Sequence, residues 1–113
     1  MALIVQKYGG TSVADPDRIN ACADNIAITR KRGNDVIVVV SAMGKATDNL
    51  IALAESVAKN QSGREMDMLL TTGERQTAAL MTMALLDRGI DAISFTGSQV
   101  GIITDTAHRK AKI

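Results

Sequence analysis

The order of apolar and polar runs along the chain predicts an α/β protein. An apolar run over residues 2–5 predicts a first strand over residues 2–7, and a continuous β-branched run over residues 35–40 predicts a second. Because the second run does not alternate with polar residues, we expect it to be buried on both faces, as in a parallel sheet covered by helices. A short third strand is predicted over residues 92–95, with a further extended segment over 100–103.

Apolar residues at helical spacing predict three helices. The first begins at Asp15-Pro16, where Asp is favoured as the N-cap and Pro at the first helical position, and it ends at Gly33. The second covers about residues 48–60. The third begins at a Ser-x-x-Glu capping box over residues 62–65 and ends near residue 89.

This order of elements favours a parallel sheet with right-handed crossovers. A chain of 113 residues can form one core but not two, and no internal repeat or linker divides it. Three or four strands would leave a raw sheet edge, so we expect the chain to be the first part of a larger domain.

Composition disfavours several classes of protein. The net charge is +1 and the charges are spread along the chain, which together with one Tyr and one Phe disfavours nucleic-acid binding. A single cysteine, Cys22, allows no intrachain disulfide and favours a cytoplasmic location. Cys22 lies at helical spacing with Ile19 and Ile26, so we interpret it as a buried residue and not a nucleophile. No signal-peptide pattern or membrane-length apolar run is present, so we expect no membrane contact.

Three loops are expected at the carboxyl edge of the sheet, where parallel α/β proteins bind ligands. They cover residues 7–12, 41–49 and 96–101, and all are rich in Gly, Ser or Thr. The first presents Lys7 and then Gly9-Gly10, which combines a positive charge with backbone N–H groups that an anion can approach. The lysine precedes the glycines, which excludes the Walker pattern. From these residues alone, the loop can be interpreted either as a phosphate site or as an ordinary turn.

Glu74 is a second candidate, because it lies on the border of the buried face of the third helix. A carboxylate there needs a partner, and either a nearby arginine or a ligand would serve. The neighbouring Gly73 costs about 1 kcal/mol of helix stability relative to alanine and allows close approach of another element. His108 lies in a polar tail and is interpreted as solvated. No cluster with metal-ligand spacing and no catalytic triad is readable.

Several segments in this order resemble the N-terminal part of the bacterial aspartate kinases, members of the amino-acid kinase family. The resemblance spans essentially the whole chain and implies a three-layer αβα sandwich of the carbamate kinase-like type, here incomplete. It rests on these blocks: Lys7-Tyr8-Gly9-Gly10-Thr11-Ser12-Val13, Val40-Ser41-Ala42-Met43-Gly44, Thr47-Asp48-Asn49-Leu50, residues 64–74, and Ser94-Phe95-Thr96-Gly97-Ser98-Gln99.

The resemblance implies transfer of the γ-phosphoryl group of ATP to the side-chain carboxylate of L-aspartate, giving 4-phospho-L-aspartate on the route to lysine, threonine and methionine. Lys7 would neutralise charge on the transferring group as the catalytic residue, and Mg²⁺ would be held mainly through the nucleotide, without protein ligands. Further contacts would come, for ATP, from Lys7, Tyr8, Gly9, Gly10 and Ser41, and for aspartate from Thr47 and Glu74.

Members of this family continue well beyond this length. We therefore expect residues 1–113 to be the N-terminal portion of the kinase domain, without its C-terminal half and regulatory domains, and to have negligible activity alone. A complementing C-terminal half or a second copy is an expected partner. Two alternatives remain open: another amino-acid kinase, such as one acting on acetylglutamate, carbamate or glutamate, or a non-catalytic truncated or split product that pairs through its open sheet edge.

Overall fold

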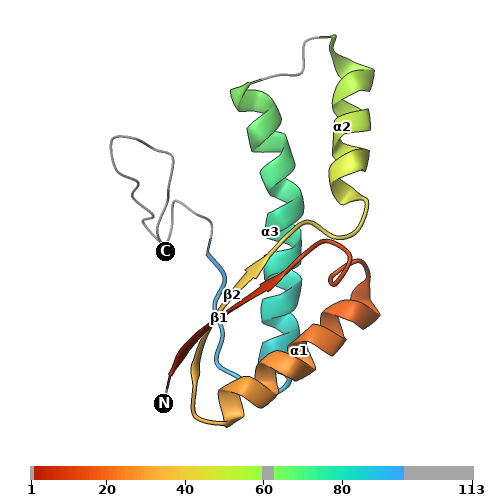
Figure 1. Ribbon diagram of the computed structural model, residues 1–113. Coiled ribbons are helices and arrows are strands. Elements are labelled where there is room, and N and C mark those ends of the chain that lie inside the picture. The colour runs from red at the N-terminus through yellow and green to blue at the C-terminus, as the bar shows by residue number, and fades with distance from the viewer. Residues whose placement is uncertain (1, 60–62, 96–113) are drawn as a thin grey trace, which may run out of the picture.

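The computed structural model describes residues 2–59 and 63–95. The predicted order is confirmed through the third helix (Figure 1). The elements are, in chain order, β1 (Leu3–Tyr8), α1 (Pro16–Lys31), β2 (Asp35–Val40), α2 (Ala46–Val57) and α3 (Arg64–Asp87).

β1, α1 and β2 form a parallel β–α–β unit, as predicted. The two strands pair in parallel from Leu3 opposite Asp35 to Tyr8 opposite Val40. The side chain of Asp15 accepts a hydrogen bond of 2.8 Å from the Arg18 N–H, which satisfies one of the unpaired donors at the start of α1. Gly33 follows the end of α1 with a φ of 92°, a left-handed conformation that favours glycine.

α1 and α3 pack on the same face of the two-stranded sheet. Their buried side chains, with Val13 from the loop before α1, form the core, and Val36, Val38 and Val40 of β2 pack against it. Arg88 joins the two helices at their edge. Its Nε donates to Asp24 of α1 at 2.8 Å, and its guanidinium also donates to the Asn20 carbonyl. The core therefore lies between one face of the sheet and these two helices.

The opposite face of the sheet is not covered by any of the described residues. Leu3 and Val5 of β1 are 65% and 57% exposed, and Ile37 and Val39 of β2 are 40% and 36% exposed. The prediction that residues 35–40 are buried on both faces is therefore wrong for this chain. The physical reason is that both long helices lie on the same side, so the β-branched run has one covered and one uncovered face.

The third predicted strand is also not formed. Residues 90–95 run past the sheet without a strand ladder, although Ile90 and Ala92 pack against the core. Ile93 and Phe95 are 72% and 50% exposed. A short strand requires a backbone partner, and in the described residues β2 pairs only with β1. The extended segment predicted over 100–103, like His108, lies outside the described residues.

The boundaries of α2 and α3 differ from those predicted. α2 begins at Ala46, two residues early, and Lys45 as its N-cap provides no side-chain hydrogen bond. α3 begins after Gly63, which takes the N-cap position expected for Ser62 and has no side chain to offer. Ser62 itself lies outside the described residues. Among the described helices, none combines the length and apolar character needed to cross a membrane.

Candidate anion-binding loop at the carboxyl edge of the sheet

Two of the three predicted loops meet at the carboxyl ends of β1 and β2. The Ser41 N–H donates to the Tyr8 carbonyl at 3.2 Å, and the Gly44 N–H donates to the Gly10 carbonyl at 3.0 Å. A Cβ on Gly10 would lie 3.1 Å from the backbone oxygen of Ala42, closer than most real contacts. Glycine at position 10 therefore suits the close approach of the two loops, because a Cβ there would force the second loop to shift slightly. The third loop, residues 96–101, lies outside the described residues.

The backbone between Tyr8 and Ser12 has its carbonyl oxygens engaged inside the protein. The Tyr8 and Gly10 carbonyls accept from the second loop, and the Gly9 carbonyl accepts from the Ser12 N–H at 3.0 Å. The Thr11 carbonyl accepts from Arg18 Nη1 at 2.8 Å, and the Ser12 carbonyl accepts from the Cys22 thiol at 3.2 Å. All five acceptors in this turn are thus occupied.

The amide donors of the same turn are not occupied. Among the described residues, the N–H groups of Gly9, Gly10 and Thr11 have no hydrogen-bond partner. A short backbone segment with engaged carbonyls and unpaired amides has a net positive local potential, and such segments bind phosphate and other anions. We call residues 9–12 the amide turn.

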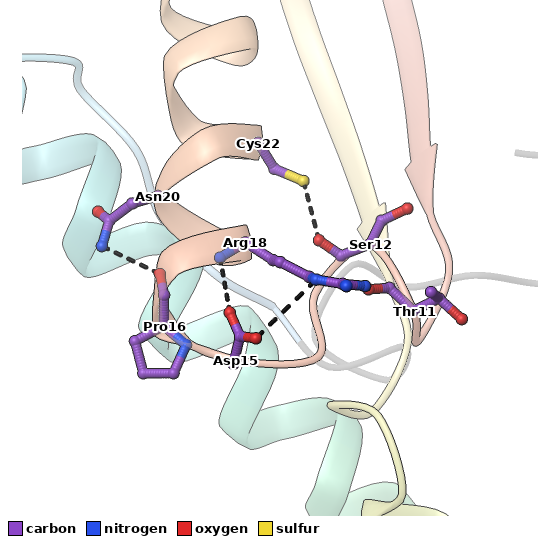
Figure 2. Close-up of polar contacts among 7 residues, drawn as sticks. All are labelled: Thr11, Ser12, Asp15, Pro16, Arg18, Asn20 and Cys22. Carbon is purple, nitrogen blue, oxygen red and sulfur yellow. Dashed lines mark hydrogen bonds and ion pairs between the residues drawn. The ribbon is translucent and has the colours of Figure 1, made fainter.

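α1 holds the amide turn from one side (Figure 2). Arg18 and Cys22, about one helical turn apart, reach the carbonyls of Thr11 and Ser12. Cys22 is 7% exposed, and its burial raises the pKa of its thiol, so that the proton needed for donation stays on sulfur at neutral pH. Cys22 is buried, as predicted, but sequence spacing did not reveal its hydrogen bond to the loop.

Tyr8 lies on the helix-covered face of β1. Its hydroxyl donates to Gln6 at 2.9 Å, and Gln6 in turn donates to Thr29 of α1 at 3.0 Å. Burial, and to a smaller extent the nearby Cys22 thiol, raise the pKa of Tyr8. Its hydroxyl and carbonyl are both engaged, so Tyr8 anchors the end of the strand beside the amide turn.

Lys7 has the opposite orientation. Side chains alternate along a strand, so Lys7 shares the uncovered face with Val5 and with its partner Val39. Its side chain is exposed and carries its charge at the carboxyl end of β1, two residues before Gly9. The structure thus places Lys7 and the amide turn at the same end of the sheet.

Glu74 and Thr47 lie on α3 and α2. Gly73 brings α3 against the second loop, because a Cβ there would lie 3.0 Å from Ala42 Cβ and 3.4 Å from Leu50 of α2. This confirms the close approach predicted for Gly73. Glu74 follows it, exposed, on the wall of an open groove between α3 and the free edge of β2.

Neither of the two predicted aspartate contacts forms an ion pair with a side chain among residues 2–59 and 63–95. The arginine partner left open for Glu74 is not found in the described part of the chain, where the ion pairs join other residues. Thr47 is half-buried at the second position of α2. The groove that Glu74 lines does not include Lys7, the amide turn or Thr47.

Metal ligation by side chains finds no support in residues 2–59 and 63–95, which contain no group of three or more His, Cys, Asp or Glu able to hold an ion. The amide turn itself fits the phosphate groups of a nucleotide, because it offers unpaired N–H donors and a nearby lysine.

The fold and the loop together define a parallel α/β protein with a glycine-containing turn of unpaired amides, among the described residues, at the carboxyl edge of its sheet. The chain belongs to the amino acid kinase family, whose sequence model matches residues 2–113. This confirms the family that the motifs indicated.

Individual relatives are similar over the whole chain. It is 58% identical over 113 residues to the aspartokinase of Mycobacterium tuberculosis, and 50% identical to aspartokinase 2 of Bacillus subtilis. It covers 27% and 28% of these two proteins, and thus spans about a quarter of their length. The crystal structure of aspartate kinase from Synechocystis superposes with a TM-score of 0.82 and 54% identity, over 86% of this chain and 17% of that chain. The structure is consistent with an incomplete αβα amino-acid kinase fold, as predicted.

Proposed function

We propose that this chain is the N-terminal portion of the kinase domain of an aspartate kinase. The reaction transfers the γ-phosphoryl group of ATP to the side-chain carboxylate of L-aspartate and yields 4-phospho-L-aspartate. One observation carries the proposal: Gly9, Gly10 and Thr11 present amides that have no partner among residues 2–59 and 63–95, next to a lysine and in a turn whose carbonyls are all engaged. The similarity to aspartokinases of other bacteria supports the choice of substrate.

The proposed roles follow from charge and position. The amides of the turn bind phosphate oxygens, and Lys7 offsets the negative charge of the group in transfer. Ser41 directly follows β2, donates its N–H to the Tyr8 carbonyl and adds a polar contact on the phosphate side. No protein nucleophile is required, because positioning and charge stabilisation supply most of the catalysis in phosphoryl transfer.

Aspartate is proposed to bind on the α3 side of the amide turn. Thr47 lies in the first turn of α2, an end without a side-chain cap, so backbone donors there are available to a carboxylate. Glu74 is proposed to hold the α-amino group, since its carboxylate has no ion-pair partner within residues 2–59 and 63–95. Mg²⁺ would be held by the phosphates of ATP and would neutralise charge there.

Further parts of the proposal concern the chain as a unit. We infer that the rest of the nucleotide pocket is supplied by sequence beyond this quarter of the relatives' length, so the chain alone turns over negligibly. The reaction takes place in the cytoplasm, where the unpaired Cys22 stays reduced.

A chimera tests the activity. This chain replaces the matching segment of the M. tuberculosis aspartokinase, which is 58% identical to it. We expect ADP release with L-aspartate and Mg-ATP, and none above background with acetylglutamate or glutamate. Turnover of acetylglutamate, or a folded chimera without aspartate turnover, would reject the proposed substrate.

Matched lysine variants test the assigned charge. In the chimera, Lys7→Met should lower kcat at least 100-fold, as is typical for loss of a charge that stabilises the transition state. Lys31→Met removes an equal charge at the far end of α1 and should change kcat less than about twofold. Equal effects of the two substitutions would remove Lys7 from the proposed mechanism.

A further inference from the structure

We propose that Arg18 is a positioning residue that sets the direction of the Gly10 amide through a relay of two peptide units, and that Cys22 fixes the end of the same turn. This inference rests on the proposed function of the amide turn as a phosphate site. It assigns a role to two residues of α1 that lie outside the candidate site itself.

The relay begins at the Arg18 guanidinium. Nη1 donates to the Thr11 carbonyl at 2.8 Å. Because a peptide unit is planar, holding that carbonyl also fixes the Ser12 N–H at the other end of the same unit. The Ser12 N–H donates to the Gly9 carbonyl at 3.0 Å. The Gly9 carbonyl and the Gly10 N–H belong to the same planar peptide unit, so this hydrogen bond also orients the Gly10 N–H. Arg18 is thus linked to an unpaired amide without touching the ligand.

The neighbouring amides are held differently. The Gly9 and Thr11 N–H groups belong to peptides whose carbonyls accept from Ser41 and Gly44 of the second loop. Only the Gly10 amide depends on a hydrogen bond within the turn, and that bond depends on the Thr11–Ser12 peptide. Loss of the Arg18 donor should therefore affect Gly10 most strongly.

Arg18 is itself fixed by Asp15. The Asp15 carboxylate accepts from the Arg18 N–H at 2.8 Å and lies 3.9 Å from its Nε (Figure 2). The Arg18 side chain is 54% exposed, so a single hydrogen bond to it contributes modestly. Its importance comes from orientation of the turn and not from a large stabilisation.

Cys22 holds the exit of the turn. Its thiol donates to the Ser12 carbonyl at 3.2 Å, which fixes the following peptide and the N–H of Val13, a fully buried residue. A serine at this position keeps a donor, whereas an alanine keeps only part of the packing. The two substitutions therefore separate donation from volume.

Arg18→Met and Arg18→Lys test the relay in this chain, labelled with ¹⁵N and ¹³C. Without ligand, Arg18→Met should change the NMR chemical shifts of the Thr11 carbonyl carbon and the Gly10 amide. The chemical shift of the Gly9 amide should change little. In the chimera, which supplies the rest of the nucleotide pocket, the Kd for Mg-ATP from calorimetry should rise about tenfold, in line with loss of one charged hydrogen bond. Lysine retains a donor and should restore the Gly10 amide position and the affinity to within about threefold.

Controls separate the relay from net charge and from packing. Arg32→Met removes an exposed charge beyond α1 and should leave both readouts unchanged. Cys22→Ser should keep the wild-type shift of the Ser12 carbonyl and the wild-type Kd, whereas Cys22→Ala should change both.

Each outcome decides between the two proposals. If the Gly10 amide resonance does not shift in folded Arg18→Met, the relay is wrong, whether or not the Kd for Mg-ATP changes. The relay is also wrong if folded Arg18→Lys does not return the Gly10 amide resonance to its wild-type position. If the shifts behave as expected but the folded chimera with an unchanged Arg18 does not bind Mg-ATP, the relay stands and the proposed phosphate site is wrong.

Discussion

Gly9 and Gly10 are adjacent in sequence but differ in their surroundings, and this gives a matched pair of substitutions. In Gly10→Ala the new Cβ would lie 3.1 Å from the Ala42 oxygen, a backbone atom that moves only with its loop. We expect a loss of about 1–3 kcal/mol in the free energy of unfolding. Gly9→Ala meets nothing within 4 Å and should change it by less than about 0.5 kcal/mol. Urea denaturation measures both, and equal losses would contradict the loop contact.

The buried thiol predicts a pH dependence of stability. Burial raises the pKa of Cys22 above its value in the unfolded chain. Above the ordinary thiol pKa of about 8.5 the unfolded chain loses its proton first, so the free energy of unfolding should fall as pH rises from there through the folded pKa. Tyr8, whose pKa is also raised, adds a fall at higher pH. Thermal melts from pH 7 to 10 should show a smaller decline in Cys22→Ser, and an identical decline would exclude the thiol.

At the residue scale, the sequence predicted which side chains carry the candidate chemistry but not how they are held. Lys7 and the glycine pair were readable because charge and glycine spacing are local properties. The donors from Arg18 and Cys22 were not, because a hydrogen bond to a loop carbonyl depends on how α1 packs beside that loop. The motif-based assignment of Thr47 and Glu74 to aspartate stays a prediction.

At the scale of elements, Gly73 tests how α3 meets the rest of the protein. Alanine is favoured over glycine inside a helix by about 1 kcal/mol. In Gly73→Ala, however, the new Cβ would lie 3.0 Å from the Ala42 Cβ, and overpacking of this kind costs about 1–3 kcal/mol. The clash should therefore win, with a net loss near 1 kcal/mol in urea denaturation. If Gly73→Ala instead increases the free energy of unfolding, the second loop can move away from the new Cβ at little cost.

The control for Gly73 is its neighbour Glu74. Its side chain is exposed and has no ion pair in the described residues, so Glu74→Ala should change the free energy of unfolding by less than about 0.5 kcal/mol. In the chimera it should instead raise the KM for aspartate. A stability loss equal to that of Gly73→Ala would place Glu74 in the packing of α3.

The start of α1 was predicted correctly because Asp15 and Pro16 specify it locally. The starts of α2 and α3 were not, since neither has a side-chain cap to mark it. Burial of β2 on both faces and a strand at 92–95 were wrong for a common reason. Both depend on pairing and covering by other segments, which apolar runs alone do not specify.

At the scale of the whole molecule, the sheet face that no described residue covers predicts self-association. Leu3, Val5, Ile37 and Val39 place four exposed apolar side chains side by side on two paired strands. Apolar surface of this kind favours contact with another protein surface over water. We expect sedimentation velocity to show dimers or larger species that increase with concentration.

Threonine substitutions on the two faces of the sheet test this expectation. Threonine is also β-branched and suits a strand, so Val5→Thr with Ile37→Thr should weaken self-association at least threefold while stability changes by less than about 1 kcal/mol. Val38→Thr on the helix-covered face should instead destabilise the fold by about 1–2 kcal/mol, because its hydroxyl would be placed against the core. A wild-type chain that stays monomeric at all concentrations would show that this face does not drive association. If the double variant associates as strongly as wild type, the contact is not made by these side chains. The backbone groups at the free edge of β2 would then be the alternative contact.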